Sequence, residues 1–440
     1  MAAPRHVTRK EFLSALKDSN LLSREQYVHA RELFPDSDRG RVLARALVEE
    51  GLLTKFQAER LLVGRTSGFH LDQYVILAEL GRGGMGRVYK ARHRTMNRTV
   101  ALKVLAPDLT SSPRAQDMFL REVRAVAQLV HPNLVTAFDA NLVGDRYYLV
   151  LEYVDGPNLD QLVRSRGALV VGQACDFIRQ AAQGLQCAHV AGMVHRDIKP
   201  ANILVQLRAA DGSPGLVKIS DFGLAKLKDP AGGPGHNTIL TKPNTVMGTP
   251  DFLSPEQARS LHRTDIRSDL YSLGCTFYFL LTGEVPFPGG TSMEKLLRHT
   301  MEEPIPVEEL CSDVPPQVAA IVRKLMAKKP EDRYQTPADV VQALEPFSVS
   351  GPTPWEPVRP EPLPVLEEAV PLEDDSDPVM KALEGTMPPA AGLTPMSNSI
   401  LAPLSGKRRR ISRRFFFWTV ALSFLLGGAA AAAYFFLFHQ

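Results

Sequence analysis

A glycine-rich segment between two strand-like runs constrains the fold of this chain more than any other feature. The segment GRGGMGRVYKA starts at Gly81 and follows the run YVILAEL, which starts at Tyr74. A lone GxGxxG pattern is weak evidence, because dinucleotide-binding folds place it between a strand and a helix. Here the β-prone runs RVYKARH and TVALKVL come after the glycines. The context therefore predicts a glycine hairpin whose backbone amides lie over phosphates.

Lys103 emerges from the apolar run VALKVL. A lysine in such a strand is costly to bury without a charged partner. The sequence offers two candidate partners, which are Glu122 on the helical stretch AQDMFLREVRAVAQLV and the phosphates of a nucleotide.

Two polar motifs further along the chain, HRDIKPANIL and KISDFGLA, carry the strongest chemical signal. Their functional side chains and glycine are His195, Arg196, Asp197, Lys199, Asn202, Asp221, Phe222 and Gly223. Together with the glycine segment and Lys103, the motifs follow the order found in eukaryotic-type (bacterial Hanks-type) serine/threonine protein kinases. Residues 74–347 resemble that family, which implies an α+β, bilobal protein-kinase-like fold that uses ATP and Mg²⁺.

The resemblance implies a nucleotide site. The backbone from Leu80 to Val88 would cover the phosphates. Val88 and Ala101 would pack on one face of the adenine, and Leu204 on the other. The segment from Glu152 to Val154, in LVLEYVDG, resembles the hinge whose backbone hydrogen-bonds the adenine. The implied ATP-binding residues are Leu80, Gly81, Arg82, Gly83, Gly84, Met85, Gly86, Arg87, Val88, Ala101, Lys103, Glu152, Val154 and Leu204.

The resemblance also implies the catalytic roles. Lys103 would hold the α- and β-phosphates and pair with Glu122, while Asp197 would orient the substrate hydroxyl and accept its proton. Asn202 and Asp221 would hold Mg²⁺, a hard cation that suits oxygen ligands. Lys199, and Thr249 in GTPDFLSPEQ, match the serine/threonine branch of the family, so we expect protein substrates that offer serine or threonine hydroxyls.

Three threonines, Thr238, Thr241 and Thr245, lie between Asp221 and Glu256. A phosphate on this segment could pair with Arg196, and we expect autophosphorylation, with Thr241 and Thr245 the favoured acceptors. The alternative is that these threonines are solvated loop residues.

The chain departs from the family pattern in two places. The usual APE reads Ser254-Pro255-Glu256, and we still expect Glu256 to pair with Arg333. The insertion RAADGSPG between Val205 and Val217 is rich in turn residues and predicts an exposed excursion. Asp269 matches the family's aspartate that steadies the catalytic loop.

The C-terminal part of the sequence predicts a membrane anchor. Residues 415–438 carry no charge, and at 1.5 Å per residue they reach about 36 Å, enough for a transmembrane helix. Six basic residues within 407–414 precede this span, which places the preceding chain in the cytoplasm. With two residues after the span, we expect no folded domain beyond the membrane. A buried core helix is the alternative, and Gly427-Gly428 suits either self-association or lipid contact.

Residues 348–406 are rich in proline and carry an acidic block between Glu367 and Asp377. We expect a disordered tether without a packed core, with recognition by a partner domain as the alternative.

Residues 1–70 read as helices with a weak internal repeat at a shift of 31 residues. Leu21-Leu22-Ser23 with Gln26 matches Leu52-Leu53-Thr54 with Gln57. Each copy predicts a helical hairpin with a capped second helix. The small helical N-terminal region is either a partner-binding module or an extension that packs on the next domain.

The 440-residue chain has 51 Lys and Arg against 48 Asp and Glu, and its formal charge is +3. Because six positive charges gather in 407–414, the rest is mildly acidic, and a nucleic-acid binder with a broad basic surface is unlikely on this composition. The four scattered cysteines predict neither a disulfide framework nor a zinc site. Two other classes compete with a protein kinase. A binding scaffold without activity conflicts with the intact Lys103, Asp197, Asn202 and Asp221, and a small-molecule kinase conflicts with GTPDFLSPE.

Overall fold

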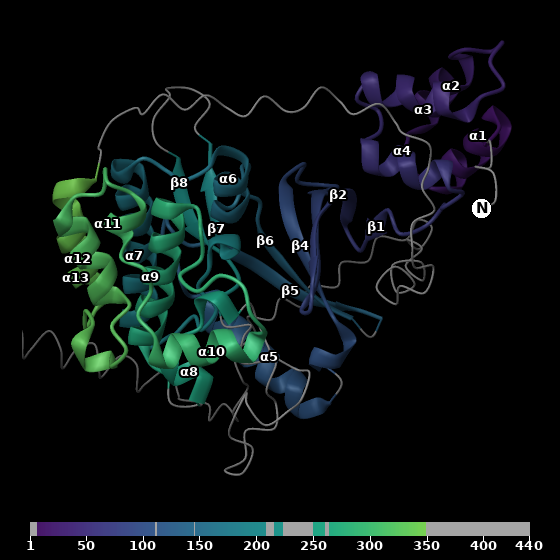
Figure 1. Cartoon of the computed structure of the whole chain (residues 1–440). Coiled ribbons are helices and arrows are strands. Elements are labelled where there is room, and N and C mark those ends of the chain that lie inside the picture. The colour runs from purple at the N-terminus through teal and green to yellow at the C-terminus, as the bar shows by residue number, and fades with distance from the viewer. Residues whose placement is uncertain are drawn as a thin grey trace, which may run out of the picture. The chain divides into compact units, whose positions relative to one another are not determined.

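The computed structural model describes residues 7–110, 112–144, 146–207, 215–222, 250–259 and 264–348 (Figure 1). The predicted tether beyond Ser348, the basic segment 407–414 and the predicted transmembrane helix 415–438 lie outside these residues. Within the described ranges, no helix is both long enough and apolar enough to span a bilayer.

Four helices make up the described residues before the first strand. They are α1 (Arg9–Asp18), α2 (Arg24–Glu32), α3 (Gly40–Glu49) and α4 (Lys55–Leu62). The caps that the repeat predicts are present, because Ser23 accepts a hydrogen bond from the Gln26 amide and Thr54 from the Gln57 amide. In both copies the glutamine side-chain oxygen also accepts a hydrogen bond from the backbone amide of the cap residue, which completes a capping box. The helices share a core that includes Phe12, Leu16, Leu43, Leu47, Leu61 and Phe69.

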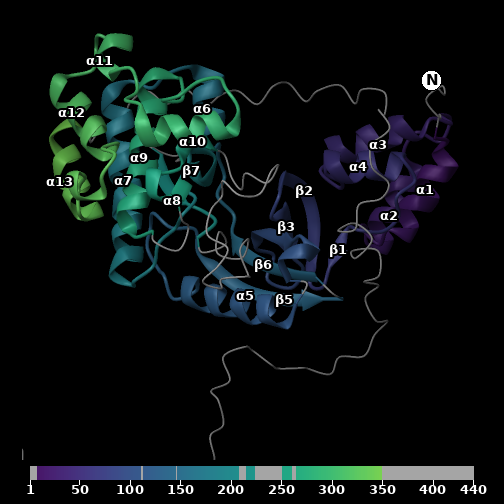
Figure 2. The ribbon, with the colours of Figure 1, turned by 60° about the horizontal axis from the view of Figure 1, so that its bottom comes forward.

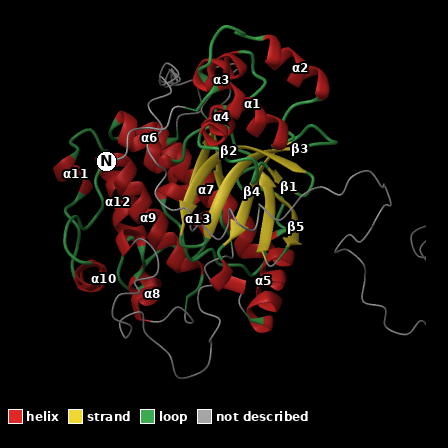
Figure 3. Ribbon diagram, turned by 90° about the vertical axis from the view of Figure 1, so that its right-hand side faces the viewer, coloured by secondary structure: helices red, strands yellow, loops and turns green. Residues whose placement is uncertain are grey.

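A six-stranded antiparallel sheet follows, with strand order β1-β2-β3-β4-β6-β5 (Figure 3). The strands are β1 (His70–Leu71), β2 (Tyr74–Gly83), β3 (Gly86–His93), β4 (Thr99–Leu105), β5 (Ala137–Val143) and β6 (Arg146–Glu152). The glycine hairpin predicted from the sequence is confirmed, since β2 and β3 pair up to Gly83 and Gly86. Gly86 has φ +130°, and a Cβ there would lie 2.0 Å from the Val104 carbonyl oxygen, so the turn requires glycine.

One long helix, α5 (Pro113–Val126), accompanies the sheet after the short turn η1 (Pro107–Thr110). Phe119 of α5 is fully buried in a cluster with Leu105, Leu109, Ala140 and Leu149. This packing fixes the helix that carries Glu122 against the strands that carry Lys103.

The second lobe is mainly helical. Its described helices are α6 (Leu159–Arg166), α7 (Val171–Val190), α8 (Pro255–Arg259), α9 (Ile266–Thr282), α10 (Ser292–Met301), α11 (Val307–Leu310), α12 (Pro316–Leu325) and α13 (Pro337–Leu344). Helix α7 packs against α9 and α13 (Figure 2). A two-stranded sheet, β7 (Ile203–Gln206) with β8 (Leu216–Ile219), lies at the start of this lobe. The predicted bilobal α+β fold is therefore confirmed for the described residues.

Candidate active site

Asp197, Lys199 and Asn202 form one hydrogen-bonded group beside β7. The Lys199 Nζ atom lies 3.1 and 2.9 Å from the two carboxylate oxygens of Asp197. The Asn202 Nδ2 atom donates to the Asp197 carbonyl at 2.8 Å and to its Oδ2 atom at 3.1 Å. The Asp197 carboxylate is thus held in one orientation with a cation beside it, as a group that positions a hydroxyl requires.

The backbone that carries this group is held by Asp269, the first-turn acid of α9. Its two carboxylate oxygens accept the His195 and Arg196 amides, each at 2.7 Å. Burial raises the pKa of Asp269, against the effect of the hydrogen bonds from these amides. Arg196 adopts φ +69°, a strained value for a non-glycine residue. Asp269 therefore takes the steadying place that the sequence predicts.

His195 is fully buried and its two ring nitrogens have different roles. Its Nε2 atom lies 2.8 Å from the Ser220 carbonyl oxygen, which can only accept. Its Nδ1 atom accepts the Asp197 amide at 3.2 Å. This pattern fits the neutral imidazole with the proton on Nε2. The Phe222 ring packs edge-on against it at 4.4 Å between centroids, which joins the two polar motifs.

Lys103 lies on β4 with only 4% of its surface exposed. Its Nζ atom is 2.8 Å from the Asp221 Oδ1 atom. Burial acts to raise the pKa of Asp221, but the adjacent Lys103 ammonium outweighs it and holds that pKa below its ordinary value. Glu122 and Asp221 line the same small cavity, whose other walls are mainly apolar. Lys103 is thus paired with Asp221, a partner that the sequence analysis did not name, while the predicted partner Glu122 lines a cavity that Asp221 also lines.

The residues that the resemblance assigns to ATP include residues of β2, β3, β4 and β7. Val88 is opposite Lys103 in the β3–β4 register, and Ala101 is on the same strand as Lys103. Leu204 is on β7, directly after Asn202 and Ile203. Leu80 is 45% exposed, and the backbone from Gly81 to Val88 forms the end of the hairpin. Met85 is next to Lys103, with its Sδ atom 4.0 Å from Nζ.

Glu152, in the segment that resembles the family's hinge, forms an ion pair that the motifs do not predict. The Glu152 carboxylate binds the Lys218 Nζ atom at 3.0 Å, and its other oxygen accepts the Thr136 amide at 3.1 Å. Because its side chain is engaged there, Glu152 can serve a nucleotide only through its backbone. Lys218, on β8, has 6% of its surface exposed and the Glu152 side chain 23%, so the pair is partly shielded from water.

Ser254 and Gln257 extend the site in a way that the sequence analysis missed. Gln257 Nε2 donates to the Arg196 carbonyl oxygen at 2.8 Å, while its Oε1 atom accepts from the Ser254 amide and hydroxyl. The pattern Ser-x-x-Gln before α8 is a capping-box signal, and it could have suggested the local bond but not the contact with Arg196.

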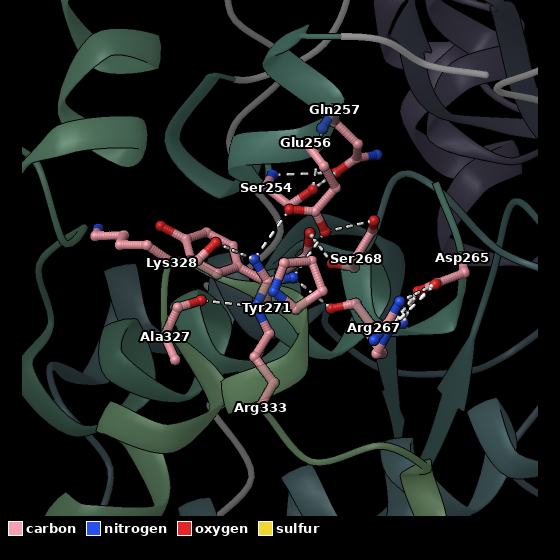
Figure 4. A network of polar contacts seen from close by, with 12 residues as sticks. Ser254, Glu256, Gln257, Asp265, Arg267, Ser268, Tyr271, Ala327, Lys328 and Arg333 are labelled. Atoms are coloured by element: carbon pink, nitrogen blue, oxygen red, sulfur yellow. Dashed lines mark hydrogen bonds and ion pairs between the residues drawn. The ribbon is translucent and has the colours of Figure 1, made fainter. Parts of the chain in front are cut away.

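The predicted pair of Glu256 and Arg333 is present (Figure 4). The two guanidinium nitrogens bind the two carboxylate oxygens at 2.7 and 2.9 Å, and Ser268 donates to the same carboxylate at 2.6 Å. Burial acts to raise the pKa of Glu256, but these bonds, above all those from Arg333, leave it lowered. The pair anchors α8 to the rest of the helical lobe.

Several predicted residues lie outside the described part of the chain. They are Gly223, Thr238, Thr241, Thr245 and Thr249. The described residues contain no group of three or more His, Cys, Asp and Glu side chains suited to a metal ion. Asn202 and Asp221 nevertheless fit an oxygen-coordinated cation, because the Asn202 amide nitrogen faces Asp197 and leaves its oxygen available.

Among known families, the one described as "Protein kinase domain" matches residues 74–344. A probable serine/threonine-protein kinase of Clostridium perfringens is 37% identical over 284 residues, 64% of this chain and 39% of that protein. The serine/threonine-protein kinase PknB of Mycobacterium tuberculosis is 39% identical over 280 residues, 62% of this chain and 43% of that protein. This chain thus spans about two fifths of these relatives.

Among solved structures, the crystal structure of the Mycobacterium tuberculosis PknI kinase domain aligns with a TM-score of 0.49 and 23% identity. The alignment covers 64% of this chain and 99% of that chain.

Proposed function

Because this chain belongs to the protein kinase family, we propose that it is a serine/threonine protein kinase that transfers the γ-phosphoryl group of ATP to hydroxyl groups of proteins. The observation that carries the proposal is the hydrogen-bonded group formed by Asp197, Lys199 and Asn202. Asp269 holds the backbone that precedes this group. The relatives named as serine/threonine kinases support the choice of acceptor.

Asp197 is the residue we assign to the acceptor hydroxyl. Its carboxylate accepts the hydroxyl hydrogen bond, aims the oxygen at phosphorus and takes the proton as the new bond forms. Lys199, 2.9 Å from the same carboxylate, offers its positive charge to the phosphoryl oxygens, where negative charge is concentrated. Little covalent chemistry is required of the protein, so positioning carries most of the effect.

Asn202 and Asp221 are the residues we assign to Mg²⁺, which when bound neutralises the phosphate oxygens. Lys103 then serves the α- and β-phosphates. Its present partner is Asp221, at 2.8 Å. Since cation binding engages the oxygens of Asp221, we expect Lys103 to turn toward the phosphates and Glu122.

The C-terminal sequence supports a further proposal about location. Residues 415–438 anchor the protein in a membrane as a single-pass helix, and residues 407–414 keep the kinase and the N-terminus cytoplasmic. Protein substrates would then be cytoplasmic, and lipid would be a partner of the anchor. The expected self-association rests only on Gly427-Gly428 and is part of the same proposal.

Alkaline carbonate extraction of cells that express the full chain tests the anchor. We expect the protein to remain with the membranes. The double variant Leu425→Arg with Leu426→Arg should be released, because each arginine costs about 3 kcal/mol at the centre of a span. Retention of that variant, or release of the parent, contradicts the anchor.

Phosphoryl transfer is tested with the full chain in detergent micelles, Mg²⁺ and γ-labelled ATP. We expect label on serine and threonine of a generic protein acceptor, and a turnover about 10²- to 10⁴-fold lower in Asp197→Asn. Asp160→Asn, which breaks an exposed pair with Arg164, is the matched control and should keep full activity. Absence of both ATP binding and phosphoryl transfer would favour the scaffold over the enzyme.

A further inference from the structure

Helix α4 is attached to strand β2 by two hydrogen bonds, one buried and one partly buried. The Thr54 hydroxyl donates to the Leu77 carbonyl oxygen at 2.6 Å, and the Gln57 Nε2 atom donates to the Ile76 carbonyl oxygen at 2.7 Å. Gln57 is 4% exposed. Phe56, on the same helix, packs against the apolar cluster of the sheet. The N-terminal helices therefore contact the sheet through α4.

The two carbonyls belong to a β-bulge. Leu77 is the extra residue where the β2–β3 register shifts between Ile76 and Ala78. A bulge interrupts the ladder and leaves backbone groups in need of other partners. The Thr54 and Gln57 side chains supply donors at this point, so the helix and the irregular strand complete each other's hydrogen bonding.

The internal repeat contains its own comparison for this contact. Gln26 and Gln57 occupy the same place in their capping boxes. Gln26 is exposed, whereas Gln57 is buried and reaches the sheet with the nitrogen that its cap does not use. The two copies share the cap and differ in the attachment.

A line of charges continues from α4 to the glycine hairpin. Arg60 of α4 is 9% exposed, and its Nη2 atom lies 3.8 Å from the Glu79 Oε2 atom. The same oxygen lies 3.5 Å from the Arg87 Nη1 atom. Glu79 comes two residues before Gly81, and Arg87 directly follows Gly86. One carboxylate thus joins the helix to both strands of the hairpin, in a site where partial burial strengthens the charge interactions.

We propose that α4 positions the glycine hairpin, with Gln57, Arg60 and Glu79 as positioning residues, so that the N-terminal helices set the affinity for the nucleotide. The inference rests on the proposed function in one respect, the assignment of the hairpin to the ATP phosphates. It gives residues 7–69 a role in nucleotide binding. The role as an extension that packs on the next domain thereby acquires a consequence for catalysis.

The test uses Gln57→Glu in the full chain, with Gln26→Glu as the matched control. Glutamate keeps both capping boxes, since its oxygen still accepts from the cap residue. At position 57 it also removes the donor and places a carboxylate against the Ile76 carbonyl. We expect the dissociation constant of ATP, measured by titration calorimetry, to rise about threefold to tenfold in Gln57→Glu and to stay unchanged in Gln26→Glu.

Glu79→Gln is the second variant and does not alter α4. It removes the shared charge with little change of shape, and we expect a similar rise in the dissociation constant. Steady-state kinetics should show a higher KM for ATP with kcat nearly unchanged, a split that a general loss of folding would not produce. Equal ATP affinity in the parent, Gln57→Glu and Glu79→Gln overturns the inference. Because ATP binding is measured without phosphoryl transfer, this result stands apart from the activity test.

Discussion

The side-chain amide of Gln257 donates to the backbone carbonyl oxygen of Arg196 across 2.8 Å. Gln257 belongs to the helix that follows Pro255, and Arg196 directly precedes Asp197. The bond therefore ties α8 to the backbone that directly precedes the proposed catalytic residue. The Asp269 carboxylate accepts a hydrogen bond from the Arg196 amide in the same stretch of backbone. Hydrogen bonds therefore hold both the amide and the carbonyl oxygen of Arg196, whose φ angle is strained.

Gln257→Glu should lower kcat about tenfold and leave ATP affinity unchanged, because it removes one hydrogen bond and puts a carboxylate against a buried carbonyl. The matched control is Gln161→Glu. Gln161 forms the same capping box before α6 and is exposed. Steady-state kinetics with a peptide acceptor measure both variants. If Gln257→Glu turned over as fast as Gln161→Glu, the bond to Arg196 would have no part in positioning Asp197.

Arg333→Gln should destabilise the helical lobe by about 3–5 kcal/mol, because it leaves the Glu256 carboxylate buried without its cation. In the parent, the pKa of Glu256 is lowered. The pair with Arg333 therefore stabilises the folded parent at pH values above the ordinary pKa of a glutamate, and this stabilisation is lost as the pH falls through the lowered pKa. In the variant, burial raises that pKa instead.

The melting temperature measured against pH distinguishes the two cases. On acidification from pH 7 to about pH 5, we expect the difference in melting temperature between the parent and Arg333→Gln to narrow, because Glu256 of the variant becomes protonated. Arg323→Gln, which breaks the exposed pair with Glu308, is the control and should stay near the parent. A difference that does not depend on pH would contradict the assigned cause.

His299→Gln should reduce the sensitivity of the fold to acid. His299 is fully buried beside Tyr271, and burial, with Lys328 nearby, lowers its pKa to about 3. Between its ordinary pKa and this value the unfolded chain binds a proton that the folded chain does not. Stability therefore falls with decreasing pH, by up to about 1.4 kcal/mol per pH unit. Melting temperatures between pH 7 and pH 4 should show a shallower slope in the variant, and equal slopes would refute the prediction.

Replacement of Thr238, Thr241 and Thr245 together by alanine should lower activity on a protein acceptor, if phosphate on these residues pairs with Arg196. Mass spectrometry of the parent after incubation with ATP should find phosphate on Thr241 or Thr245. The Asp197→Asn variant purified alone should lack it. Full activity of the triple variant would show that these threonines are ordinary loop residues.

The parts of the site that the sequence predicts are those encoded locally. The glycine hairpin needs only its glycines and two β-prone runs, and Asp197, Lys199 and Asn202 are within one short loop. The pair of Glu256 and Arg333 was predictable because both motifs belong to the family pattern.

The contacts that sequence reasoning missed join distant segments through ordinary polar residues. Lys218 with Glu152, Gln57 with Ile76 and Gln257 with Arg196 depend on where whole elements lie, and no local periodicity encodes them. The partner of Lys103 is a different case. Asp221 pairs with Lys103, and Glu122 lines a cavity that Asp221 also lines. We expect the choice between these two acids to depend on bound ligands and charge.

In the capping boxes at Thr54–Gln57 and Ser254–Gln257, the side-chain amide of the glutamine makes two kinds of hydrogen bond. Its oxygen accepts from the cap residue at the start of the helix, and its nitrogen donates to a backbone carbonyl of another segment. Sequence alignments usually treat Gln and Glu as interchangeable at this place, because both begin a helix equally well. Here only glutamine can also fasten that helix to another part of the molecule. In a homologous chain, we expect glutamate at either position to preserve the start of the helix but to remove its hydrogen bond to β2 or to Arg196.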